Sequence, residues 1–168
     1  MTFERPVDQL NEVGVLNRRE IEARIVAPLL ERLADRFGPD VYETTREVIV
    51  DIARAQGSDL AAVVGDTTLP AFASALGAWS ADGALETEVR ELSDEVFAFD
   101  VTRCRYAEMY RALGLADLGA TMSCNRDGSL IEGFNPDVVF TRTRTIMAGD
   151  DHCDFRFELP ATPVEIRT

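Results

Sequence analysis

The sequence predicts an α+β fold, with a helical N-terminal half followed by a four-stranded antiparallel sheet of two hairpins and two inserted helices. Apolar residues recur every three to four positions up to about residue 80 and then alternate with polar residues, which is the change from helical to strand periodicity. At 168 residues the chain is long enough to form one core without disulfide or metal support. We expect a single domain over residues 1–168, with an extended segment at 1–16 and a loosely held tail at 160–168.

Three longer helices are expected in the first half, over residues 18–37, 40–56 and 68–80. Each carries apolar residues at helical spacing. These residues are Ile21, Ile25, Leu29, Leu33 and Phe37 in the first, Val41, Val48, Ile52 and Ala55 in the second, and Leu69, Phe72, Leu76 and Trp79 in the third.

Turn and capping residues set the helix bounds. Asn17 is the expected N-cap of the first helix, and Pro28 inside that helix predicts a kink. Gly57 is expected to end the second helix, with Ser58 capping a short separate piece.

Alternating residues in the second half predict four strands. A helix pair over residues 105–115 and 115–128 separates the two hairpins, with Gly114 as the break. The expected strands lie near residues 85–91, 95–103, 137–147 and 152–159.

Composition restricts the function. All 17 basic residues are arginine, so chemistry that needs a lysine, such as a P-loop or a pyridoxal phosphate Schiff base, is excluded. The net charge of −13 disfavours nucleic acid and anionic membrane surfaces as partners. No apolar run approaches the roughly 20 residues of a membrane span, and the N-terminus has no signal-peptide pattern. We expect a cytoplasmic protein.

Three cysteines, Cys104, Cys124 and Cys153, are candidates for chemistry. An odd number at wide separations does not suggest a disulfide framework. Each can be read as a small buried hydrophobe or as one ligand of a zinc site. Cys104, between Arg103 and Arg105, and Cys124, two residues before Arg126, can also be read as thiolates activated by a nearby arginine. Because all three fall at the ends of elements, we expect at least two of them in one pocket, with Asp127 or Asp154 alongside.

Two arginines alternate with threonines in the segment FTRTRT. For Arg142, pairing with the acidic first hairpin (Glu86 and Glu88) and bidentate binding of a substrate carboxylate both stay open, whereas pairing is expected for Arg144.

The single histidine, His152, lies in a turn, where a solvated side chain is expected. Without it, a buried carboxyl with raised pKa, such as Asp127, would be the general base. Asp127 follows Cys124 by three residues, which is one helical turn if the helix extends that far. The Asn-Arg-Asp-Gly segment that follows Cys124 also reads as a turn.

The C-terminal half shows a recurrent pattern: a cysteine at a strand-to-helix junction, a C-x-x-D step in "ATMSCNRDG", the segment "RTRT", then "GD" and the strand "CDFRF". In this order, over about residues 95–158, the chain resembles the L-2-amino-thiazoline-4-carboxylic acid hydrolase family. The resemblance implies that water opens a cyclic amidine, giving an N-carbamoyl amino acid in the case of the reaction that names the family. The helical half carries no motif of this resemblance.

Site residues follow from this resemblance together with the chemistry of amidine attack. We expect hydrolysis of a non-peptide C–N bond in a 2-amino-thiazoline-4-carboxylate-like substrate, by water or by a cysteine thiolate. The expected catalytic residues are Cys124 and Asp127 first, with Cys153 and Asp154, and the expected substrate-binding residues are Arg142 for the carboxylate, Cys104 and Asn135.

The thiolate route needs no cofactor; zinc on Cys104, Cys124 and Cys153 is the alternative. The expected partner is a small molecule with a carboxylate, and a homodimer is left open. Two other functions also stay open. The first is a non-catalytic ligand-binding or sensor domain with a cysteine or zinc site, similar to the vinyl-reductase-like domains. The second is a pathway accessory protein that keeps the fold without hydrolysis.

Overall fold

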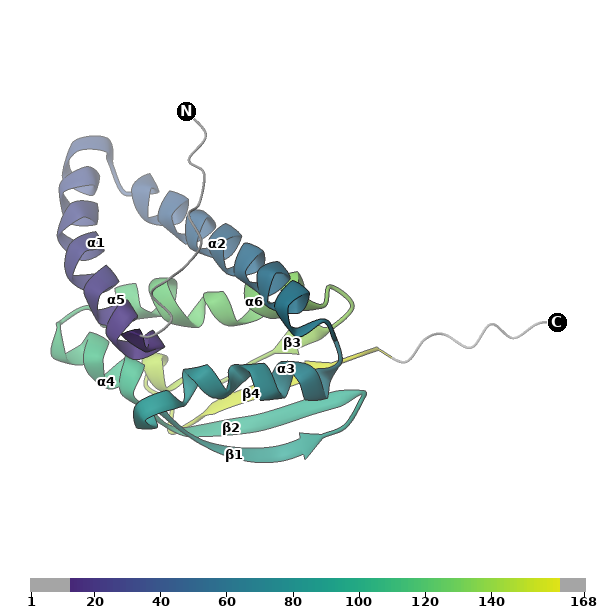
Figure 1. Cartoon of the computed structure of the whole chain (residues 1–168). Helices are drawn as coiled ribbons and strands as arrows, with labels where there is room; N and C mark the ends of the chain where they lie inside the picture. The colour runs from purple at the N-terminus through teal and green to yellow at the C-terminus, as the bar shows by residue number, and fades with distance from the viewer. Residues whose placement is uncertain (1–12, 161–168) are drawn as a thin grey trace.

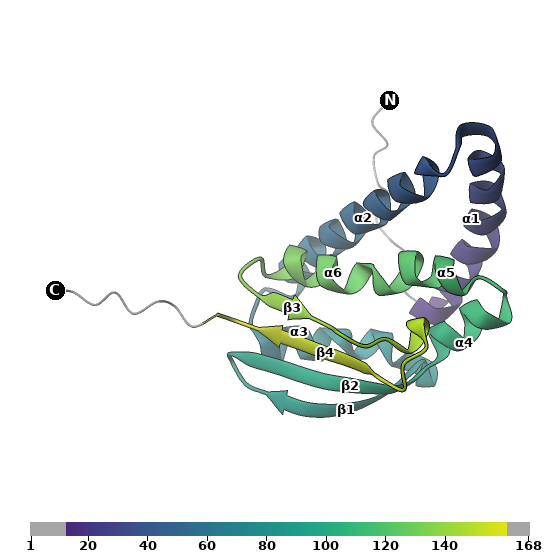
Figure 2. The same ribbon diagram turned by 180° about the vertical axis from the view of Figure 1, so that it is seen from behind.

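The computed structural model describes residues 13–160, and the expectations for both chain ends lie almost wholly outside this range. Four strands form one antiparallel sheet in the order β1-β2-β4-β3, and the helices lie over one face of it (Figures 1 and 2). The predicted α+β class is therefore confirmed. The main elements are α1 (Val15–Phe37), α2 (Asp40–Val64), α3 (Leu69–Ala75), β1 (Leu85–Leu92), β2 (Val96–Cys104), α4 (Arg105–Ala112), α5 (Ala116–Gly119), α6 (Arg126–Phe134), β3 (Val139–Thr141) and β4 (Cys153–Glu158).

Phenylalanine rings fill the core between the sheet and its helices. On β4, Cys153, Phe155 and Phe157 are buried and alternate with more exposed residues, as the sequence pattern predicts. The ring of Phe157 lies 5.3 Å from that of Phe72 on α3, in an edge-on arrangement. This packing fixes β4 in the centre of the sheet, and it places Cys153 at the end of β4 next to the pocket described below.

Helices α2 and α6 cross in close contact through two glycines. A Cβ atom at Gly57 would lie 2.0 Å from the carbonyl oxygen of Leu130, and one at Gly133 would lie 1.9 Å from that of Arg54. The prediction that Gly57 ends its helix is therefore wrong, because α2 continues through it to Val64. Gly57 does not cap a helix; its lack of a side chain allows α6 to cross α2 closely. The crossing places α6, including its first turn, against α2.

The chain stays helical beyond residue 128, where the second inserted helix is expected to end, and reaches Phe134. A π-helical turn (Ala120–Cys124) leads into α6, whose first turn is the segment that reads as an Asn-Arg-Asp-Gly turn in the sequence. The expected strand at 137–147 shrinks to Val139–Thr141, followed by extended chain and a short 3-10 helix, Ile146–Ala148.

Helix α1 presents a different face to the core from the one its apolar spacing predicts. Ile21, Ile25 and Leu29 are more than half exposed, and the helix packs through Ala23, Ala27 and Leu30. Small residues allow the close approach here. The N-cap is Gly14, with φ of 65°, so the assignment of Asn17 is also wrong.

Within the described residues, no single helix is long and apolar enough to cross a membrane. Only α2 taken together with Leu69–Trp79 passes such a test, and that pair is bent by 105°.

Candidate active site

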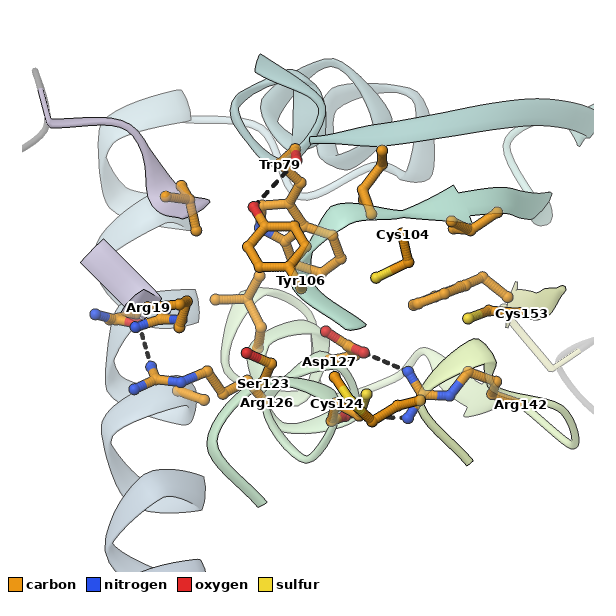
Figure 3. A pocket seen from close by; sticks show the side chains of 18 residues that line it. Arg19, Trp79, Cys104, Tyr106, Ser123, Cys124, Arg126, Asp127, Arg142 and Cys153 are labelled. Atoms are coloured by element: carbon orange, nitrogen blue, oxygen red, sulfur yellow. Dashed lines mark hydrogen bonds and ion pairs between the residues drawn. The ribbon is translucent and has the colours of Figure 1, made fainter. Parts of the chain in front are cut away.

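A pocket with a volume of about 100 Å³ lies between the sheet and helices α1, α2, α4 and α6 (Figure 3). All three cysteines line it together with Asp127 and Arg142, in agreement with the expected convergence of the thiols. Three different parts of the fold supply the thiols: the end of β2, the π-helical turn and the start of β4. The remaining wall is mainly apolar.

Asp127 and Arg142 form an ion pair in the pocket wall. A guanidinium Nη1–H of Arg142 donates to Oδ2 of Asp127, and Nη2 donates to the carbonyl oxygen of Cys124 at 3.1 Å. The guanidinium also lies over the rings of Phe155 and Phe140, at 5.0 and 5.6 Å from their centroids. Of the two interpretations left open for Arg142, pairing with the first hairpin is wrong, because β3 ends at Thr141 and Arg142 pairs with Asp127 of α6.

The Asp127 carboxyl is buried, and this burial raises its pKa to about 6, although Arg142 acts in the opposite direction. The expected effect of burial on Asp127 is therefore present. A carboxyl with this pKa exchanges its proton near neutral pH, which is the property needed in a general acid or base. Burial alone would lower the pKa of Arg142, but Asp127 together with Cys124 and Cys153 raises it.

The three thiols are held in their neutral form. Burial raises the pKa of Cys104 to about 11, and burial together with the neighbouring Asp127 raises that of Cys124 to about 12. Burial also raises the pKa of Cys153. Two of the sulfur atoms accept backbone hydrogen bonds: that of Cys104 from Ala107 N at 3.4 Å and that of Cys153 from Ile146 N at 3.2 Å.

Arg126 does not favour a thiolate at Cys124, because its guanidinium is directed elsewhere. Its Nε donates to the carbonyl oxygen of Met122 at 2.9 Å and its Nη1 to Oε1 of Gln56 at 3.2 Å. Arg19 of α1 also lines this end of the pocket. Sequence reasoning gave Arg126 a different role and missed Arg19, which looks like any exposed arginine in the helical run NRREIEAR.

Two expected site residues, Asp154 and Asn135, lie outside the pocket. Asp154 accepts hydrogen bonds from the backbone N–H groups of Thr143 and Arg144, and so shapes the chain that follows Arg142. The side chain of Asn135 bonds to Thr67 O and Asp137 N in a loop at the far end of α6.

His152 bonds to Asp151 at 2.6 Å. Arg144 also pairs with Asp151, at 3.4 Å, and not with Glu86 or Glu88 as expected. The β3–β4 connection folds back on itself, so these charges meet locally.

The cysteines do not form a metal site. Among residues 13–160, no group of three or more histidine, cysteine, aspartate or glutamate side chains is arranged to hold a metal ion. The three thiols expected as zinc ligands are therefore not grouped closely enough in this structure to hold the ion together.

A mostly apolar pocket with a few convergent charged groups, one of them a carboxyl of shifted pKa, is the kind of site at which proteins bind or transform small molecules. The family model for L-2-amino-thiazoline-4-carboxylic acid hydrolase matches residues 18–157, and the chain belongs to this family. The match extends over the helical half, in which the sequence shows no motif. No curated protein matches the chain.

Proposed function

We propose that the protein is a hydrolase that opens the ring of a small cyclic amidine bearing a carboxylate, of the 2-amino-thiazoline-4-carboxylate type. The observation that carries this proposal is the buried carboxyl of Asp127, with a pKa of about 6, in the wall of a small pocket beside Arg142. The name of the family supports the same substrate.

The size of the pocket suits a compact substrate. A cavity needs roughly 10–15 Å³ of this volume for each water-sized group. A cavity of about 100 Å³ therefore holds a single small ring with its substituents. Peptide or sugar chains would not fit without rearrangement.

The amidine of such a substrate matches Asp127. An amidinium is planar and presents N–H donors side by side, as a guanidinium does, so a carboxylate binds it in the same fork geometry. Asp127 already binds one guanidinium, that of Arg142, through a hydrogen bond from Nη1 to Oδ2. We propose that Arg142 fixes the orientation of Asp127, and that the carboxylate receives the amidine from the side of the pocket.

The ionisation states of the site at neutral pH favour water as the nucleophile. At neutral pH, a thiol with a pKa of 11 to 12 carries almost no thiolate, whereas Asp127 is largely ionised. Asp127 would take a proton from water as the oxygen attacks the amidine carbon, and would return a proton to the leaving atom. Cys124 would act as nucleophile only after losing its proton to Asp127.

The bond that breaks determines the product. For the neutral ring, water places its oxygen on the amidine carbon and one hydrogen on the ring nitrogen. Expulsion of the ring sulfur, which takes the second hydrogen, leaves an N-carbamoyl group and a free thiol. Expulsion of the ring nitrogen would instead give a free amine and an S-carbamoyl group. An N-carbamoyl product thus requires C–S cleavage and excludes the ring C–N cleavage expected from the sequence.

Incubation with L-2-amino-thiazoline-4-carboxylate tests the proposal. The product is followed by the appearance of thiol and identified by mass and by its free or blocked amine. We expect turnover by the wild type, a loss of about 10²- to 10⁴-fold in Asp127→Asn, and less than about tenfold loss in Cys124→Ser. Asp151→Asn, at an exposed carboxylate outside the pocket, is the matched control.

The second candidate is a binding protein without catalysis. It is favoured by the neutral state of the three thiols and by the closed Asp127–Arg142 pair, which give no preformed nucleophile. Saturable binding of the same compound with no turnover by the wild type would support this candidate and contradict hydrolysis.

A further inference from the structure

Two buried arginines, Arg19 and Arg126, have no part in the ring opening proposed above. Arg19 comes from the second turn of α1 and Arg126 is the first residue of α6. Each side chain keeps only 10% of its accessible surface. Figure 3 shows both at one end of the pocket, with Arg142 at the other end and Asp127 between them.

The two guanidinium groups share a single carboxylate. Oε2 of Glu22 accepts a hydrogen bond from Nη1 of Arg19, and the same oxygen lies 3.9 Å from Nη2 of Arg126, beyond hydrogen-bond distance. The closer partners of Arg126 are neutral oxygens, from Met122 and Gln56. The single negative charge of Glu22 is thus shared between two buried positive charges.

The pocket as a whole is positive in a strongly acidic protein. Among the described side chains that line it, three are arginine and one, Asp127, is acidic, while the full chain has a net charge of −13. Burying like charges side by side is unfavourable. Burial and the neighbouring Arg19 lower the pKa of Arg126 to about 10. An anion between the two groups would relieve this repulsion and accept hydrogen bonds from both guanidinium groups.

We infer that Arg19 and Arg126 form the binding site for the substrate carboxylate, while Arg142 holds Asp127. This inference rests on the proposed function for the identity of the ligand. Arg142, the residue that the sequence assigns to the carboxylate, is engaged by Asp127, by the Cys124 carbonyl and by two aromatic rings. A substrate bound with its carboxylate between Arg19 and Arg126 extends its ring toward Asp127 and Cys124, where the amidine carbon would be attacked.

The test uses two ligands that differ only in the anion. L-thiazolidine-4-carboxylate has the ring and the carboxylate but no amidine, so it cannot be opened by the proposed reaction; thiazolidine lacks the carboxylate. Calorimetric titration of the wild type should show tighter binding of the carboxylate compound. Arg19→Gln and Arg126→Gln should each weaken its binding by about ten- to hundredfold and leave thiazolidine binding unchanged.

Three further variants show whether a loss of binding comes from the lost charge or from misfolding. Arg19→Lys and Arg126→Lys retain the charge and should recover part of the lost affinity. Arg24→Gln, at an exposed arginine of the same helix, should bind as the wild type does. Equal binding of the two ligands by the wild type, no binding of either, or full carboxylate affinity in both glutamine variants would overturn the inference. If the carboxylate site behaves as expected but L-2-amino-thiazoline-4-carboxylate is not turned over, the hydrolysis fails and the anion site stands.

Discussion

The guanidinium of Arg142 and the carboxylate of Asp127 meet inside the pocket and join the segment after β3 to the first turn of α6. Their side chains keep 12% and 14% of their accessible surface. Solvent therefore screens the attraction between the two charges only weakly, although both side chains also line the cavity. It links the stability of the fold to the chemistry of the site.

Loss of Arg142 should be costly. Arg142→Gln leaves the Asp127 carboxylate buried without its partner, and breaking a buried pair in this way costs about 3–5 kcal/mol. Arg144→Gln is the matched control, because Arg144 pairs with Asp151 at an exposed site, and such a pair contributes about 0–1 kcal/mol. Urea unfolding at pH 7.5 measures both. Equal losses in the two variants would contradict the importance of the buried pair.

The pH dependence of stability should identify Asp127. Its pKa of about 6 in the folded protein is above the ordinary value of 3.8. The protonated form is thus favoured on folding, and this contribution is present below about pH 4 and is lost as pH rises through 6. Between pH 4 and 7, the free energy of unfolding of the wild type should fall relative to Asp127→Asn by about 2 kcal/mol. A constant difference between the two proteins would show that the pKa is not raised.

The thiols should react slowly in the folded protein. With pKa values of about 11 and 12 for Cys104 and Cys124, the thiolate fraction at pH 8 is roughly two to three orders of magnitude below that of a free cysteine. Labelling with iodoacetamide, followed by mass spectrometry, should be fast in denaturant and slow without it. A cysteine that labels equally fast in both conditions carries an activated thiolate and would restore the thiolate mechanism.

The crossing of α2 and α6 should tolerate no side chain at its two glycines. Gly57→Ala and Gly133→Ala each place a Cβ about 2 Å from a backbone oxygen of the other helix, and such overpacking costs about 1–3 kcal/mol or more. Gly77→Ala is the control, since nothing lies within 4 Å of its Cβ position and its φ is not positive. Thermal unfolding of the three variants gives the comparison. Wild-type stability at Gly57→Ala would mean that the helices are further apart than described.

Strand alternation made the sheet predictable. On β4, Cys153, Phe155 and Phe157 occupy the buried face as the period of two requires. The ends of the helices were harder to predict, because a glycine can either end a helix or allow a second helix to approach closely. Gly57 reads as a helix end but allows a helix crossing, which depends on a partner helix remote in the sequence. The full length of α6 was not expected either, because this helix begins at an Asn-Arg-Asp-Gly segment that is typical of turns.

The convergence of the three thiols and Asp127 in one pocket followed from their places at element ends. Their ionisation did not, because proximity to arginine in the sequence says nothing of where a guanidinium points. The Nε of Arg126 donates to the carbonyl oxygen of Met122 and not to Cys124. Burial is the largest influence on the Cys124 thiol and raises its pKa. Arg19 could not be chosen from several arginines of α1, since only the packing of that helix determines which of its sides is buried.

The central claim is that the ionisation of Asp127, and not that of a thiol, controls the reaction. The pH profile of kcat/KM for L-2-amino-thiazoline-4-carboxylate tests it most directly, because this profile reports the essential groups of the free enzyme. With Asp127 as base, activity should rise through an apparent pKa near 6 and reach a plateau by about pH 7 to 8, because the pKa of Asp127 is about 6. Activity that is still rising above pH 8, toward the pKa of the cysteines, would contradict the claim and identify a thiolate as the reactive group.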